Sequence, residues 1–138
     1  MPGFSDSWEN QVLKHRFSIL KCATCPMYVG LSSADPLDDA SGTSEPTAAK
    51  GYARVKTTTT SGTSWEIASA TGVTVQNAAI ITFPTASNDW GTMTHFALFS
   101  GGTAGASVLC SGALTANKTV ENGDTARFAA GALDICLK

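Results

Sequence analysis

Four cysteines are the residues of this chain with the widest range of possible chemistry. They are Cys22, Cys25, Cys110 and Cys136. Cys22 and Cys25 form a C-x-x-C pair, a spacing found in redox centres and in zinc sites. A thioredoxin-like redox pair is followed by a helix, whereas here Pro26 and a β-rich run come next. A four-cysteine zinc site would need Cys110 and Cys136, each isolated on its own predicted strand, to converge on the pair. The sequence therefore favours neither a redox centre nor a zinc site.

The oxidation state of these four candidate disulfide cysteines stays open on sequence alone. Disulfides form in oxidising surroundings. The N-terminal residues are polar and acidic where a secretion signal requires a basic and then an apolar stretch, so we expect the chain to be made and folded in a cytoplasm. A protein that folds in a cytoplasm and is later released from the cell would meet oxidising surroundings only after release, when disulfides could form. Cys136 alternates with Asp134 and Lys138 on one strand face, which makes it the best candidate for a bond to another chain. Free, buried thiols are the alternative.

The other residue types that catalyse reactions or bind ions show no working spacing. His15 and His95 are not spaced as a ligand pair, and we expect His95, in a predicted strand, to be structural. No G-x-S-x-G nucleophile motif occurs, and Gly101-Gly102 lies between strands, not before a phosphate-binding helix. Four acids share one predicted loop without calcium-loop spacing, so a solvated loop is the simpler interpretation. They are Asp35, Asp38, Asp39 and Glu45. We therefore expect no enzyme, no metal and no cofactor.

Length and composition limit the classes of partner. The 138 residues suffice for one domain, residues 1–138, with a core that needs neither metal nor disulfide. Charged residues make up 14% of the chain, well below the roughly 25% of an average globular protein. This suits permanent packing against other proteins, and it suits a threonine-rich β surface equally well. The net charge is −2, and no apolar run reaches the roughly 18 residues of a membrane span. We expect no nucleic-acid partner and no membrane partner.

The N-terminal part predicts one α-helix at about residues 5–20. Asp6 and Glu9 have the spacing of a capping box, and apolar residues recur at helical intervals from Trp8 to Leu20. This helix could cover a sheet or reach a neighbouring subunit. Residues 32–50 lack periodicity and are rich in Ser, Asp, Gly and Pro. They predict a long surface loop, of a length that is often functional.

From about residue 26 to 138 the pattern predicts a mainly β fold, an antiparallel β-sandwich or jelly-roll-like arrangement. Roughly eight or nine short strands follow one another at near-regular spacing. The central strand lies in residues 88–100, where period-two alternation places large apolar groups on both faces. We expect it to be covered on both sides. A glycine-rich turn at 101–105 then leads into the next strand, which predicts a central hairpin.

Two further turns are predicted in the strand region. Asn122-Gly123-Asp124 is a strong hairpin signal and should join strands at 119–121 and 127–129. Gln76-Asn77 is predicted to be the turn between strands near 73–75 and 79–83. The last strand alternates through Leu133, Ile135 and Leu137.

Several segments together resemble a widespread family of small structural proteins of tailed bacteriophages and prophages. The matching pieces are the N-terminal helix ending near His15-Arg16-Phe17, then MYVGLSSADP (27–36), EPTAAKGYARV (45–55), NAAIITFPTASNDWGTMTHFALF (77–99) and SGALTANKTVENGDTARFAAGALDICL (111–137). The resemblance implies a virion accessory component, of the decoration or tail-fibre-like kind, with no catalytic motif. The cysteines depart from the family pattern. We infer from them a covalently reinforced particle, which is not a family property.

The main functional prediction is a capsid decoration or cement protein that stabilises the head shell. It would bind the major capsid protein or other virion proteins as a homo-oligomer, with a trimer near threefold sites favoured because closed symmetry is natural there. The alternative is a tail, collar or fibre component of the virion that contacts the host. A third possibility is an enzyme or carbohydrate-binding module that uses exposed aromatic residues such as Trp65 or Trp90. Contacts are expected at the N-terminal helix, the acidic loop and the cysteine-bearing edges.

Overall fold

A computed structural model describes residues 3–5, 26–57, 65–68 and 74–136 of the chain. The predicted N-terminal helix falls almost wholly in residues 6–25, outside the described residues, as do His15, Cys22 and Cys25. The described part is mainly β and every strand pair in it is antiparallel, which confirms the predicted class.

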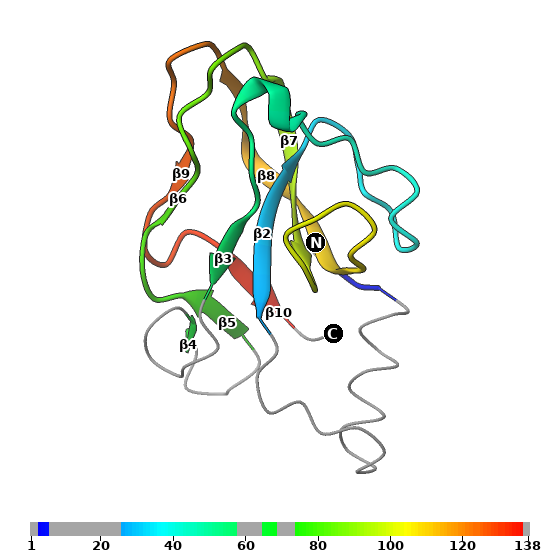
Figure 1. Ribbon diagram of the computed structural model, residues 1–138. Coiled ribbons are helices and arrows are strands. Elements are labelled where there is room, and N and C mark those ends of the chain that lie inside the picture. Colours follow the sequence, from blue (N-terminus) through cyan, green and yellow to red (C-terminus); the bar gives the residue numbers. More distant parts are fainter. Residues whose placement is uncertain (1–2, 6–25, 58–64, 69–73, 137–138) are drawn as a thin grey trace.

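The strands pair as sheets of five, three and two (Figure 1). The largest sheet has the order β1-β8-β7-β2-β3. Its strands are β1 (Gly3–Phe4), β8 (Val108–Val120), β7 (Gly91–Phe99), β2 (Met27–Ser32) and β3 (Val55–Thr57). The three-stranded sheet holds β10 (Asp134–Cys136), β5 (Thr74–Asn77) and β4 (Trp65–Ile67), and the two-stranded sheet holds β6 (Ile81–Thr82) and β9 (Arg127–Phe128). This pairing does not confirm a jelly roll, which has eight strands in two sheets.

The β7–β8 hairpin forms the centre of the largest sheet, as the alternation of residues 88–100 predicts. Large apolar side chains on both faces of β7 are buried. One face contributes Met93, Phe96 and Leu98 to the main core, and the other contributes Ala97 and Phe99 to a second, smaller cluster. The prediction that this strand is covered on both sides is therefore confirmed.

The main core lies between the largest sheet and the two smaller ones. The largest sheet supplies Val29, Leu31, Met93, Phe96 and Leu98, and the opposite side supplies Ile81, Phe83 and Leu133. Phe128 packs edge-on against Phe83 and Phe96, with ring centroids 6.2 and 6.4 Å away. Such aromatic contacts add to the free energy of burying the rings themselves.

The prediction of a hairpin at Asn122-Gly123-Asp124 is wrong about which strand the chain pairs with after the turn. The turn exists, with Gly123 at φ 89°, but the chain that follows does not fold back onto β8. It pairs with β6 instead, where Ile81 lies opposite Phe128. Pairing on β8 would leave Phe128 at a sheet edge, whereas pairing with β6 packs its ring against the core. Burial therefore overrides the local turn signal.

Two predicted strand boundaries are also corrected. Gln76-Asn77 is not a turn, because both residues belong to β5 and pair with β4 and β10. Residues 107–114 and 119–121, predicted as two strands, are parts of the single strand β8. β8 is irregular in its middle. The register passes from Met93–Lys118 to His95–Ala113, so Leu114–Asn117 bulge out opposite Thr94 alone.

Asn77 joins the small sheets through its buried side chain. It is 0% exposed. Its amide nitrogen donates to the carbonyls of Ala79 and Ala129, at 2.9 and 2.8 Å. Its amide oxygen accepts from the N–H of Leu133 at 2.8 Å. Only an amide of this size both donates twice and accepts once here, so this residue type is dictated by its partners.

Replacing Asn77 with alanine should lower the free energy of unfolding by about 3 kcal/mol, because the buried N–H of Leu133 and the partly buried carbonyls of Ala79 and Ala129 lose their partner. Chemical denaturation measures the change. Asn117→Ala, at an exposed position in the β8 bulge, is the matched control and should stay within about 0.5 kcal/mol of the unchanged chain. Equal stabilities for the two variants would show that Asn77 does not hold these segments.

Candidate interaction site

Two long loops lie together on one side of the molecule. They are the β2–β3 loop (residues 33–54), which contains the short 3-10 helix η1 (Ala48–Lys50), and the β7–β8 loop (residues 100–107). In Figure 1 they are the cyan-to-green and the yellow loops. The first corresponds to the predicted surface loop at 32–50. Long ordered loops on a rigid β scaffold are common places for binding residues.

Arg54 holds the two loops to each other and to the sheet. Its guanidinium forms a two-pronged ion pair with Glu45, with Nη2 to Oε2 at 2.6 Å and Nε to Oε1 at 3.0 Å. Its Nη1 donates to the carbonyls of Gly101 and Thr103, both at 2.9 Å. The guanidinium carbon lies 3.4 Å from the centre of the Phe99 ring. An arginine is required because its planar fork makes all these contacts at once.

Tyr52 connects this network to β2. Its hydroxyl donates to Glu45 Oε1 at 2.6 Å and accepts from the N–H of Leu31 in β2 at 2.9 Å. Burial, and then the hydrogen bond to Glu45, raise the pKa of Tyr52 above its ordinary value, so the phenol keeps its proton. Gly30 makes room for the network, because a Cβ there would lie within 2.8 Å of both Glu45 and Tyr52.

The sequence does not reveal this network. Glu45 is grouped there with the solvated acids of the loop, whereas its side chain is only 16% exposed and is ion-paired. Arg54 and Tyr52 are not predicted to have any role. A lone arginine beside an acid in a loop is no specific pattern, and its other partners lie 47 and 49 positions away.

The tip of the β2–β3 loop carries the remaining acids. Asp35, Asp38 and Asp39 are exposed. Asp35 accepts a hydrogen bond from the N–H of Leu37, and Asp39 accepts one from the N–H of Ser41. Hydrogen bonds from Ser41 lower the pKa of Asp39, so this carboxylate is charged at neutral pH.

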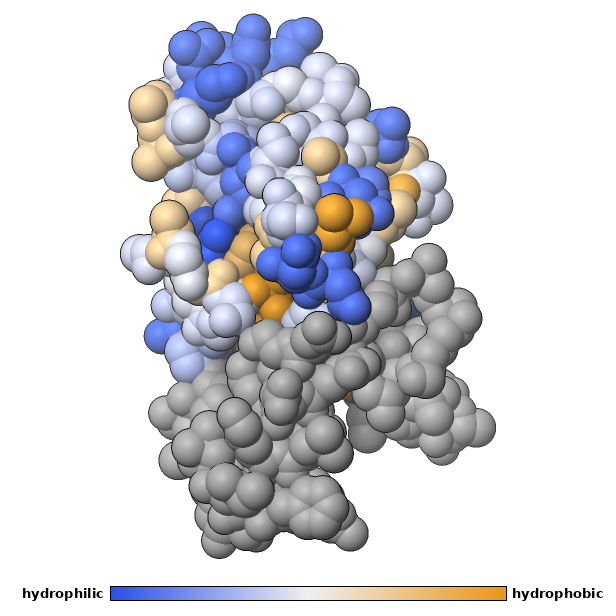
Figure 2. All heavy atoms as spheres, turned by 90° about the vertical axis from the view of Figure 1, so that its right-hand side faces the viewer, coloured by the Kyte–Doolittle hydropathy of each residue, from blue (hydrophilic) through white to orange (hydrophobic). Residues whose placement is uncertain are grey.

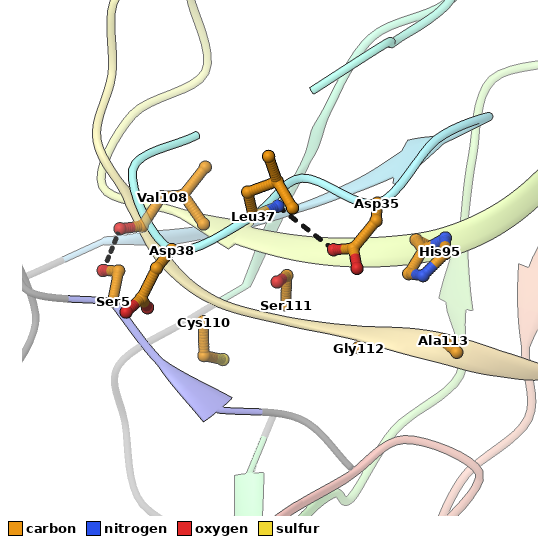
Figure 3. Close-up of a pocket in the computed structure, with 10 residues that line it drawn as sticks. All are labelled: Ser5, Asp35, Leu37, Asp38, His95, Val108, Cys110, Ser111, Gly112 and Ala113. Atoms are coloured by element: carbon orange, nitrogen blue, oxygen red, sulfur yellow. Dashed lines mark hydrogen bonds between the residues drawn. The ribbon is translucent and has the colours of Figure 1, made fainter. Parts of the chain in front are cut away.

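Beneath this tip lies a cavity of about 390 Å³ against β8. Figure 3 shows Asp35 and Asp38 from the loop, His95 from β7, and Ser111 from β8 around it. Side chains of these types could form a proton relay if hydrogen bonds connected them, but His95 is bonded elsewhere. His95 Nδ1 is hydrogen-bonded to its neighbour Thr94, at 2.8 Å from Oγ1, and no hydrogen bond among the described residues joins it to a carboxylate. The expectation that His95 is structural agrees with this bond.

Cys110 also lines this cavity, as a free thiol that is 2% exposed. Burial raises its pKa to about 12, so the thiolate that forms disulfides or attacks substrates is almost absent at neutral pH. A bond from Cys110 to another chain would first require its exposure. Cys136 ends β10 opposite Thr74, while its side chain, like Cys22 and Cys25, is outside the described part, so disulfides there stay a prediction.

The two tryptophans considered for carbohydrate binding have structural partners. Trp90 is 5% exposed and its indole N–H donates to the carbonyl of Lys50 at 2.9 Å. The indole N–H of Trp65 donates to Thr57 Oγ1 at 3.1 Å. Among the described residues no group of three or more His, Cys, Asp or Glu side chains could hold a metal ion. None of the helices in those residues is both long and apolar enough to cross a membrane.

A family model described as "Podophage GP4 fiber I protein gp80" matches residues 3–136 of the chain. The chain belongs to this family. The match covers both loops, the Arg54 network and all the described strands. A search of curated proteins found no match. The chain is therefore a phage virion structural protein of a fibre-like kind, which confirms the resemblance found in the sequence. The family description does not support capsid decoration as the main function, and it favours the alternative, a tail or fibre component.

Arg54→Met should lower the free energy of unfolding by about 3 kcal/mol, because it leaves the carboxylate of Glu45 largely buried and unpaired. Denaturant titration measures this loss. Lys56→Met removes an exposed cation of β3 and serves as the control. Combining Arg54→Met with Glu45→Gln should recover part of the loss, since the unpaired charge is gone while an acceptor for Tyr52 remains. A double variant as unstable as the sum of the single changes would contradict the pairing.

Stability should fall at alkaline pH because two groups have folded-state pKa values above their unfolded values. Cys110 has its pKa raised from 9.0 to about 12, and Tyr52 has its pKa raised above 10.0. The unfolded chain loses the Cys110 proton above pH 9 and the Tyr52 proton above pH 10, whereas the folded chain still holds both there. Each group then lowers the free energy of unfolding by up to about 1.4 kcal/mol per pH unit. In Cys110→Ala the decline should begin about one pH unit later, and an unchanged onset would contradict this origin.

Proposed function

We propose that this protein is a structural subunit of the phage tail or its fibres, and that it works by binding other virion proteins. The observation that carries the proposal is the family match over residues 3–136, whose description names a fibre protein. The role is mechanical: the subunit holds a position in the particle and presents its loops at a fixed geometry. The host cytoplasm is the proposed place of assembly and the virion the final location.

The Arg54 network supports this proposal. A surface used for recognition costs less to bind when its loops are already ordered. Arg54 ties two loops that are far apart in sequence to Phe99 in the central hairpin. The β2–β3 loop is therefore attached, through Glu45 and Arg54, to the buried ring of Phe99. This arrangement suits a surface that meets a partner without rearrangement.

The state of the reactive groups supports a structural role over an enzymatic one. The Cys110 thiol is buried and protonated. His95 is hydrogen-bonded to Thr94 rather than to an acid. The low charge content of 14% fits permanent protein contacts, whose centres are depleted in charged side chains. We propose a homo-oligomer that binds further virion proteins, with neither nucleic acid nor membrane as a partner.

Labelling of intact particles distinguishes the tail from the head. Antibodies raised against the exposed residues 102–105 of the β7–β8 loop should mark the tail or its fibres in electron micrographs, and quantitative mass spectrometry should find few copies for each copy of a tail protein. Particles from a phage that lacks this gene provide the control for unspecific label. Label spread evenly over the head, with copies in proportion to the major capsid protein, would contradict the fibre role and favour capsid decoration.

A further inference from the structure

A second cavity, of about 610 Å³, opens between β8 and the segment of β9 and β10. Its floor is the main core, with Met93, Phe96 and Leu133. Leu114 and Phe128 line it and are half-buried. We call this cavity the β8–β9 cleft. It is large enough and apolar enough to take a side chain from another molecule.

The bulge in β8 explains why a cleft exists at this point. Leu114–Asn117 leave the pairing with β7, and β9 pairs with β6 rather than with β8. The two small sheets therefore cover the core without closing against this part of β8. A closed contact would bury Leu114 and Phe128 completely, whereas both stay half-exposed.

The rim of the cleft carries an excess of positive charge. Lys118 and Arg127 line it, are exposed, and make no ion pair with another described residue. Asp134 also lines it, so the two cations leave a net positive charge there. A ligand that combines an apolar side chain with carboxylates would fit such a site.

The tip of the β2–β3 loop has this chemistry. Leu37 is 51% exposed, and it is held at φ 60°, a conformation that costs a leucine free energy. Exposed Asp35, Asp38 and Asp39 surround it and have no ion-pair partner among the described residues. Figure 3 shows the carboxylates of Asp35 and Asp38 on either side of Leu37.

The cavity beneath the tip and the β8–β9 cleft are separate cavities that share Ala113 of β8. In Figure 1 the cyan part of the β2–β3 loop, which includes the tip, lies at the right, and β6 and β9 lie at the left. Figure 2, which faces the side that carries this loop, shows small hydrophobic patches set among hydrophilic residues. Leu37 lines the cavity beneath its own tip and is not among the residues that line the cleft, so the cleft is left open to the tip of another copy.

We propose that the β8–β9 cleft binds the loop tip of a second copy of this chain. Leu37 of one copy enters the cleft of the next, and its flanking carboxylates lie near Lys118 and Arg127. The proposal deepens the proposed function by giving the homo-oligomer its contact, and it rests on that function only for its place in the virion. Such a contact joins two different surfaces, so successive copies form a closed ring or a continuing row. A closed ring of three would give the favoured trimer.

The test uses two variants of the full chain, each with one surface blocked. The tip variant carries Leu37→Asn and Asp38→Lys, and Asn suits the φ of position 37 better than Leu does. The cleft variant carries Lys118→Glu and Arg127→Glu. By sedimentation velocity, each variant alone should associate at least about tenfold more weakly than the unchanged chain. Mixed together they should form a one-to-one dimer, because one intact tip then meets one intact cleft.

Matched controls make the same chemical changes elsewhere. Ile80→Asn alters another exposed apolar residue, 59% exposed, and Lys56→Glu alters an exposed lysine on β3; both should leave association unchanged. Thermal unfolding confirms that each variant is folded. A monomeric unchanged chain, folded variants that associate normally, or a mixture with no dimer would each overturn the contact. The labelling of particles is independent of these results, so failure of the contact and failure of the fibre role are distinguishable.

Discussion

The guanidinium of Arg54 is almost removed from water, since the side chain is only 8% exposed. A charge in that position is tolerable only if every polar partner is in place. Glu45 neutralises it, two carbonyls of the β7–β8 loop accept hydrogen bonds from its Nη1, and Phe99 covers its face. Any movement of either loop would leave a charge without its partners. The path of both loops is therefore a consequence of this one side chain.

The same constraint reaches the centre of the fold. Tyr52 links Glu45 to the backbone of β2, and its ring lies 5.2 Å from that of Trp90 in an edge-on contact. Phe99 belongs to the central hairpin. The loop that carries the exposed acids Asp35, Asp38 and Asp39 is thus linked to the core, through contacts that lose their geometry together. For a protein of the podophage fibre family, this continuity lets a force on the loop pass directly to the sheet.

Periodicity in the sequence predicts the features that depend on neighbouring residues. Alternation identified β7 as a strand covered on both faces, and the glycine-rich turn identified its hairpin with β8. Features that depend on distant partners were missed or wrong. The Asn122-Gly123-Asp124 turn was located correctly, but burial of Phe128 decided which strand it leads to. Arg54 and Asn77 bond residues 47 and 52 positions away, and no local pattern carries that information. The sequence predicts that the four loop acids share one loop, but only the ion pair with Arg54 distinguishes the largely buried Glu45 from the three exposed aspartates.

The irregular course of β8 has a consequence for solubility. Among the described residues, the outer side of β8 is covered by β1 and Ser5 alone, next to its first residues, so a regular β8 would offer a long row of unpaired backbone groups. Such edges recruit strands from other chains and start aggregation, a hazard wherever many copies of one protein accumulate before a particle is complete. The four residues Leu114–Asn117 interrupt that row, and Lys118 places a charge beside it. The irregularity of β8 therefore opposes backbone pairing between crowded copies of the chain.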